Sequence, residues 1–210
     1  MSALHRIAYY QNRRDEAPNR ELAKELAAEK DRKGIREIAD NLWSKNAQIQ
    51  SDCLKVLYEV GYLRPKLVAP YAEDFLKLLH SRNNRLVWGA MIALSMVADQ
   101  RADTIYPHVA EIEQVMDQGS VITRDNGVTV LALVAAQKAV YSTTIFPYLL
   151  HHLETCRPKD VQQHAEKTAV AVTARNQQEF VAVLKQRLVD LSNSQAARVR
   201  KVIRGVEQRR

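Results

Sequence analysis

The chain has 210 residues, of which 46% are apolar and 26% charged, close to the average of soluble proteins. Only 6 glycines and 6 prolines interrupt it, which favours long helices joined by short connections. The cysteines Cys53 and Cys156 stand alone, so no disulfide framework or zinc-ribbon spacing is present. The longest apolar run, residues 130–136, is far shorter than the roughly 20 residues of a membrane-spanning helix. We therefore expect a cytoplasmic protein with no membrane span.

The formal net charge is +7, and it is unevenly distributed. Residues 161–210 contain ten basic and four acidic side chains, whereas the body of the chain is close to neutral. The net charge therefore does not by itself indicate a nucleic-acid partner.

Helical periodicity begins after residue 18. Residues 1–18 carry no sustained period, and we expect an N-terminal arm that is partly ordered. A capping helix is then predicted over residues 20–31, followed by five pairs of helices. These pairs are expected over residues 34–44 and 48–61, 68–80 and 84–98, 104–118 and 124–138, 142–156 and 161–174, and 177–191 and 194–208. No segment alternates with period two, so no sheet is expected.

A short phrase containing proline returns in three of the first helices. LVAPYAEDF, TIYPHVAEI and TIFPYLLHH place Pro70, Pro107 and Pro147 at spacings of 37 and 40 residues. Proline is tolerated in the first turn of a helix, where its missing N–H would have no partner, so we expect each proline in such a turn. A period near 40 residues predicts stacked helical hairpins.

The second helices repeat with the same period, because CLKVLYEVG aligns with AMIALSMVA at an offset of 37 residues. In LVWGAMIALSMVA, Val87 and the Ala93-Leu94-Ser95 triplet match the second-helix phrase of HEAT repeats, and Trp88 stands where arginine is usual. Over residues 30–208 the chain resembles the HEAT family of armadillo-type repeat proteins.

This resemblance implies an all-α fold, a right-handed α-α superhelix of about five HEAT-like helical hairpins plus the N-terminal capping helix. It also implies a single HEAT-like α-solenoid domain over residues 19–210. The fold alone does not determine function, because solenoids of this kind serve many functions.

No enzymatic function is indicated by motif. The sequence contains no P-loop, no dinucleotide-binding glycine pattern, no zinc-protease motif and no nucleophile elbow. We therefore expect no enzymatic activity and no cofactor.

A group of histidines near Cys156 raises the question of a metal. Adjacent residues on a helix point about 100° apart, so His151 and His152 cannot face one ion together, whereas His152 and Cys156 can. A four-ligand site would need His164 to return across the turn at residues 157–160, and a fourth group besides. We therefore predict no metal site and interpret the histidines as solvated or as favourable charges near a helix C-terminus.

The second helices in the middle of the chain are apolar nearly all round. Either they are buried between neighbouring repeats, or they form an apolar inner face on which a partner docks. In the second interpretation Trp88 and Met96 are the anchors, and another protein is the expected partner of a non-enzymatic scaffold. The candidate partner-binding residues are Arg85, Trp88, Met96 and Arg124.

Nucleic-acid binding is the alternative function. Two arginines, Arg85 and Arg124, fall at equivalent positions of successive second helices, with Gln48 and Gln163 at the same position of two others. In some HEAT-like proteins that bind DNA, side chains at such equivalent positions contact phosphates.

The last helix, QAARVRKVIRGVEQRR, has an apolar stripe and a basic opposite face. It either caps the final repeat or contacts nucleic acid or anionic lipid. The candidate basic patch consists of Arg198, Lys201 and Arg204.

Overall fold

The structure is a computed structural model that describes residues 2–208, and every regular element in this range is helical. The chain forms two compact units, Met1–Asn126 and Gly127–Arg210, with the boundary inside one helix, α9 (Val121–Ala135). The resemblance to HEAT repeats implies a single domain over residues 19–210. Because a solenoid repeat contacts mainly its neighbours, the periodic sequence pattern carries no signal for such a division.

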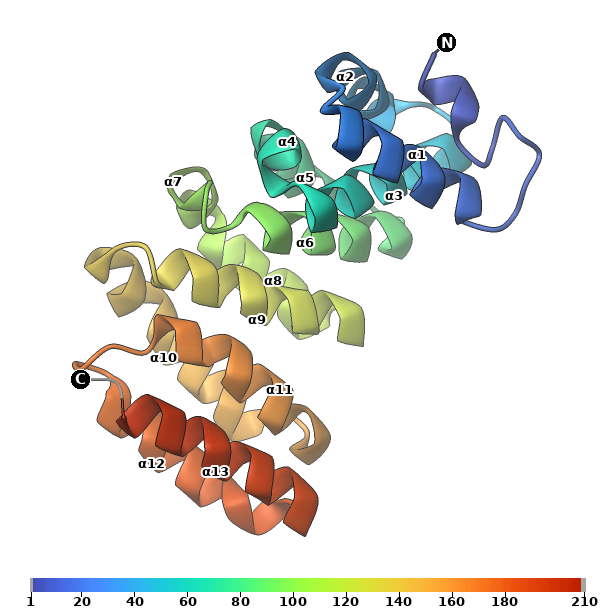
Figure 1. Ribbon diagram of the computed structural model, residues 1–210. Helices are drawn as coiled ribbons and strands as arrows, with labels where there is room; N and C mark the ends of the chain where they lie inside the picture. Colours follow the sequence, from blue (N-terminus) through green and yellow to red (C-terminus); the bar gives the residue numbers. More distant parts are fainter. Residues whose placement is uncertain (1, 209–210) are drawn as a thin grey trace. The chain divides into compact units, whose positions relative to one another are not determined.

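The first unit contains a capping helix followed by helical pairs. Its α-helices are α1 (Ala17–Glu29), α2 (Arg32–Asp40), α3 (Ala47–Leu63), α4 (Pro65–Val68), α5 (Ala72–Leu78), α6 (Asn84–Val97), α7 (Ala102–Ile105) and α8 (Val109–Gln118). Short 3-10 helices are η1 (Leu4–Arg6), η2 (Asn41–Trp43), η3 (Ala69–Tyr71) and η4 (Tyr106–His108). In Figure 1, α3 lies beside α1 and α6, while α2 packs against α3 and α5 against α6.

The second unit contains two helical hairpins after the end of α9. Its helices are α10 (Ala139–Thr155), α11 (Pro158–Thr168), η5 (Ala169–Ala171), α12 (Gln177–Arg187), η6 (Leu188–Asp190) and α13 (Asn193–Glu207). Here α10 packs on α12 and α11 on α13 (Figure 1). Phe146 and Phe180, with ring centroids 6.4 Å apart, are both buried in the core between α10 and α12.

The N-terminal segment is folded against α1 and α3, which differs from the expected arm. Ile7 and Ala8 are buried, and the Ala8 N–H donates to Asn19 Oδ1 at 2.8 Å. The Tyr9 N–H donates to Asp52 Oδ2 at 2.9 Å, and Asn19 Nδ2 donates to Asp52 Oδ1 at 3.0 Å. Two buried polar side chains thus satisfy the backbone of this segment, an arrangement that leaves no periodic signal in the sequence.

Asparagine caps explain part of the repeat. Asn46 Oδ1 accepts a hydrogen bond from Gln48 N at 2.9 Å, and Asn83 Oδ1 accepts one from Arg85 N at 3.0 Å. These two asparagines stand at the 37-residue offset and begin α3 and α6. Each satisfies an N–H group that has no partner within the helix.

The prolines lie deeper in their helices than the sequence predicted. Pro70 and Pro107 lie in η3 and η4, each between a short α-helical turn and a longer helix, and Pro147 lies inside α10. The expectation that each proline occupies a first turn is therefore wrong. Because proline cannot donate to the carbonyl four residues earlier, a 3-10 segment interrupts the first two helices.

Helix α6 is buried along nearly its whole length. Its apolar sequence thus serves mainly to pack against neighbouring helices. Among its side chains, Val87, Trp88 and Met96 keep intermediate exposure. The backbone of α6 approaches α3 closely at Gly89, where an added Cβ would lie 2.7 Å from Leu54 Cδ2. No helix within residues 2–208 has the length and apolar character needed to cross a bilayer.

Leucine at position 89 should therefore destabilise the protein. We expect Gly89→Leu to lower the free energy of unfolding by about 1–3 kcal/mol, because the new side chain overpacks the contact with Leu54. Gly205→Leu is the matched control, since no atom lies within 4 Å of a Cβ at that position. There the better helix propensity of leucine should leave stability unchanged or raised by less than about 1 kcal/mol. Urea denaturation measures both variants, and equal effects would contradict the close approach of α3 and α6.

Candidate functional site

Three aromatic side chains of the first unit form a cluster on α3 and α6. The Tyr58 ring centroid lies 6.4 Å from that of Trp88 and 6.2 Å from that of Tyr62, which meets it edge-on. Tyr58 is buried, Trp88 is half-buried and Tyr62 is 54% exposed. We call these three residues the aromatic face. The two tyrosines are one helical turn apart on α3, so their side chains lie on the same side of that helix.

A charged cluster lies beside the aromatic face and is internally paired. Lys55 Nζ lies 3.0 Å from Glu16 Oε2 and 2.7 Å from Glu59 Oε1, and its side chain is only 10% exposed. The ammonium also lies 4.7 Å from the Tyr58 ring centroid. Burial alone would lower the pKa of Lys55, but hydrogen bonds with Glu59, Tyr58 and Glu16 raise it above its usual range. Lys55 is therefore a fixed cation that links α3 to the start of α1.

Arg85 completes this cluster. Its Nη2 donates to Glu16 Oε1 at 2.7 Å, so one carboxylate holds Arg85 and Lys55 together. We call Glu16, Lys55, Glu59 and Arg85 the charge cluster. The positive charge of Arg85 is thus partly neutralised by Glu16 within the protein.

Three of the four predicted partner-binding residues, Arg85, Trp88 and Met96, come from α6. Arg85 belongs to the charge cluster and Trp88 to the aromatic face. Met96 instead packs near Gly61, where an added Cβ would lie 3.2 Å from Met96 Cγ. Arg124 Nη2 donates to the Gly119 carbonyl at 3.1 Å, at the start of its own helix. Met96 thus packs against α3, and Arg124 bonds to the backbone just before α9. A role of either residue in partner binding stays a prediction.

Sequence reasoning missed the contributions of α1 and α3. Tyr58 and Tyr62 were available as an aromatic pair at helical spacing, and Lys55 and Glu59 as an ion pair at the same spacing. Glu16 gave no such signal, because its partners lie 39 or more residues away in the sequence.

The basic patch on α13 in the second unit has the predicted character. Arg198, Lys201 and Arg204 are exposed, while Val199 and Ile203 of the same helix are buried. Arg198 and Lys201 border a groove of about 420 Å³ against α11, and Arg198 Nη1 donates to Gln162 Oε1 at 3.1 Å. The last helix thus packs on its neighbour and presents positive charge outward.

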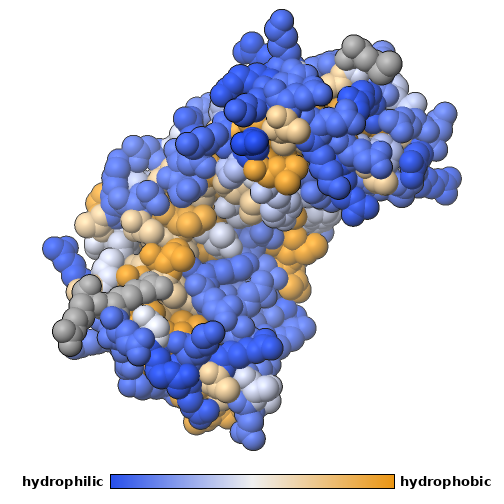
Figure 2. Space-filling model, in the orientation of Figure 1, coloured by the Kyte–Doolittle hydropathy of each residue, from blue (hydrophilic) through white to orange (hydrophobic). Residues whose placement is uncertain are grey.

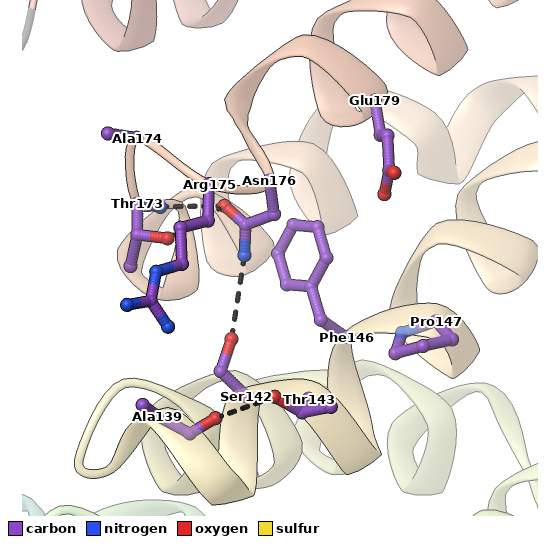
Figure 3. A pocket seen from close by; sticks show the side chains of 10 residues that line it. All are labelled: Ala139, Ser142, Thr143, Phe146, Pro147, Thr173, Ala174, Arg175, Asn176 and Glu179. Carbon is purple, nitrogen blue, oxygen red and sulfur yellow. Dashed lines mark hydrogen bonds between the residues drawn. The ribbon is translucent and has the colours of Figure 1, made fainter.

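A larger cavity in the second unit, of about 480 Å³, lies between α10 and α12 (Figure 3). Its walls include Phe146 and Pro147, and Figure 3 shows the Asn176 side chain pointing across it to Ser142. Asn176 Nδ2 lies 3.5 Å from Ser142 Oγ, and Asn176 Oδ1 accepts from Thr173 N at 2.7 Å. These polar groups connect the start of α12 to α10. The lining also includes the hydroxyl of Thr143 and the carboxylate of Glu179.

Comparison with known proteins identifies the fold. No protein-family model and no curated protein matches the chain. An engineered protein of known structure matches 99% of this chain and 97% of its own, with a TM-score of 0.71 at 16% identity. A designed armadillo repeat protein in complex with a (KR)4 peptide matches this chain over 87% of its residues and 86% of its own, with a TM-score of 0.65 at 12% identity. The chain has the HEAT/armadillo-type repeat fold.

A karyopherin, Kap121p bound to the SUMO protease Ulp1p, is also similar. It matches 95% of this chain, which covers 22% of that protein, with a TM-score of 0.64 at 14% identity. The predicted all-α solenoid and the resemblance to HEAT repeats are thereby confirmed. At these identities the likeness concerns the fold.

The charge cluster of this repeat protein predicts a stability difference between two kinds of variant. Glu16→Gln combined with Glu59→Gln leaves the Lys55 ammonium without an ionised partner. We expect a loss of about 1–3 kcal/mol in unfolding free energy, toward the lower end because Glu16 is 34% exposed. Lys55→Met removes the charge itself and should cost less. Urea denaturation compares the variants, and no loss in the Glu16→Gln, Glu59→Gln variant would show that the carboxylates do not stabilise this lysine.

Proposed function

We propose that this HEAT/armadillo-type protein is a non-enzymatic binding module for a protein partner, and that the aromatic face is its contact surface. The observation that carries the proposal is the pair of accessible aromatic side chains, Tyr62 and Trp88, on two tightly packed helices. Tyrosine and tryptophan are enriched among the residues that dominate binding energy at protein interfaces. Related folds supply further support, since the similar designed protein is in complex with a peptide and Kap121p with a protein.

The charge cluster holds the aromatic face in place before a partner binds. Lys55 links Glu16 of the chain segment before α1 to Glu59 of α3, and Glu16 also holds Arg85 of α6. The aromatic side chains are therefore held on a connected framework before any partner arrives. A preorganised surface loses little conformational entropy on binding, so more of the contact energy appears as affinity.

The chemistry of the face also indicates the kind of partner. The exposed aromatic rings suit a peptide segment with apolar side chains, or with cations that stack on the rings. The carboxylates of Glu16 and Glu59 are already paired with Lys55 and Arg85. This arrangement favours a protein segment over a phosphate backbone at this face.

Trp88→Ala should therefore abolish most partner binding. Peptides selected from a random display library on the full chain provide defined ligands for fluorescence anisotropy. We expect Trp88→Ala to weaken their binding by about 30-fold or more, as for a dominant interface residue, with little dependence on salt. Trp43→Ala is the matched control, because Trp43 is 50% exposed but lies on η2. Equal losses in both variants, or none in Trp88→Ala, would contradict the proposed surface.

Nucleic-acid binding is a second candidate function, and the exposed basic patch of α13 is the observation that favours it. Duplex DNA and single-stranded RNA are the probes, titrated across a salt series. If the patch binds phosphates, neutralising Arg198, Lys201 and Arg204 with glutamine should reduce the slope of log affinity against log salt by up to about 2.7 for duplex DNA. An unchanged slope, or no binding of wild type at low salt, would remove this candidate.

A further inference from the structure

Three potential metal ligands meet where α10 ends and α11 begins in the second unit. The ligand atoms of His152, Cys156 and His164 all lie within 4.8 Å of one another. His152 Nε2 lies 3.0 Å from His164 Nδ1, with the ring centroids 4.9 Å apart. His164 is buried, and the other two residues are half-buried.

The local sequence explains this meeting. His152 and Cys156 are one turn apart at the end of α10, where Cys156 is the C-cap residue. Pro158 starts α11 only two residues later, and its fixed φ suits the first position of a helix. The chain therefore reverses at once, and the second turn of α11 brings His164 back beside His152.

We propose that His152, Cys156 and His164 form a binding site for one zinc-class transition-metal ion, with water as a fourth ligand. The sequence predicts no metal site, because no fourth protein ligand can be named from it and the return of His164 does not follow from the spacing. A three-ligand site that keeps one open position requires only the residues that the structure brings together.

The donor set selects the class of ion. Imidazole nitrogen and thiolate sulfur suit Zn²⁺, Co²⁺ or Cu⁺, whereas Mg²⁺ and Ca²⁺ prefer oxygen. Ideal tetrahedral bonds to zinc separate two nitrogens by about 3.3 Å and a nitrogen from a sulfur by about 3.6 Å. The two histidine nitrogens at 3.0 Å are already close to this spacing, and side-chain rotation supplies the remainder.

Arg187 of α12 holds the end of α10 in place from a buried position. Its guanidinium donates to the carbonyls of Leu153, Glu154 and Cys156, the last two at 2.7 and 2.8 Å. These bonds fix the backbone that carries Cys156. Burial raises the pKa of the Cys156 thiol, with a smaller contribution from Asp160, while the Arg187 charge opposes this rise. Arg187 is thus a positioning residue that also favours the thiolate.

Binding of the metal ion replaces the thiol proton of Cys156 and a hydrogen bond between the two histidines. The ion takes the place of the Cys156 thiol proton, which is released to solvent, and both imidazoles bind through neutral nitrogens. The hydrogen bond between His152 and His164 is exchanged for two bonds to the metal. Affinity should therefore rise with pH below the pKa of the thiol, since fewer protons compete.

Cobalt titration of the reduced full chain tests the site directly, because tetrahedral Co²⁺ bound to thiolate absorbs in the visible and near-ultraviolet. We expect one Co²⁺ per chain, displaced by Zn²⁺, and a rise in melting temperature with Zn²⁺. Cys156→Ser should abolish the sulfur-to-cobalt band. His152→Ala should weaken binding by more than about 100-fold, since loss of an outer-shell partner alone costs 10- to 100-fold.

Two residues outside the site provide matched controls. His151 is adjacent to His152 but 71% exposed beside Glu154, and Cys53 is a fully buried thiol in the first unit whose pKa burial raises to about 12. His151→Ala and Cys53→Ala should bind Co²⁺ as wild type does. Far-ultraviolet circular dichroism establishes that each variant is folded. Wild-type protein without the cobalt spectrum, or bands that survive Cys156→Ser, would overturn the proposal.

Discussion

The close contact between α3 and α6 is the interaction on which the first unit depends. Gly89 lets the α6 backbone approach Leu54, and Gly61 leaves room for Met96 against α3. A side chain at either glycine would push the helices apart, because well-packed interiors have little spare volume. The position of Trp88 relative to Tyr58 follows from this contact, so the aromatic face is a direct product of core packing.

Buried polar side chains determine the backbone position of segments that lie outside the regular packing of the repeats. In the first unit, Asn19 and Asp52 hold the N-terminal segment against α1 and α3 through its backbone N–H groups. In the second unit, Arg187 satisfies the carbonyls at the end of α10. Such groups are costly to bury without partners, so each specifies one arrangement of the backbone around it. The same logic applies to Lys55, whose pairing with Glu16 joins α3 to the start of α1 at the proposed binding surface.

The fold was predictable from the sequence because each repeat is marked by short sequence motifs that recur with the same period. The recurring prolines and the Asn46 and Asn83 caps share one period, and the predicted helix pairs follow from it. The candidate site was predictable only for residues such as Trp88 that lie on the repeated second helices. The contribution of Glu16 depends on the docking of a segment that has no period of its own. The meeting of His164 with His152 depends on how α11 returns along α10, which spacing alone cannot specify.

The central claim is that a protein partner binds the surface built on α3 and α6. Hydrogen–deuterium exchange of the full chain, with and without a saturating display-selected peptide, tests this claim most directly because it locates the contact without mutation. The account predicts that the peptide slows exchange within residues 47–63 and 84–97, with no comparable change in α13. Protection confined to α11 and α13, with none in α3 or α6, would contradict it and place partner binding on the basic patch.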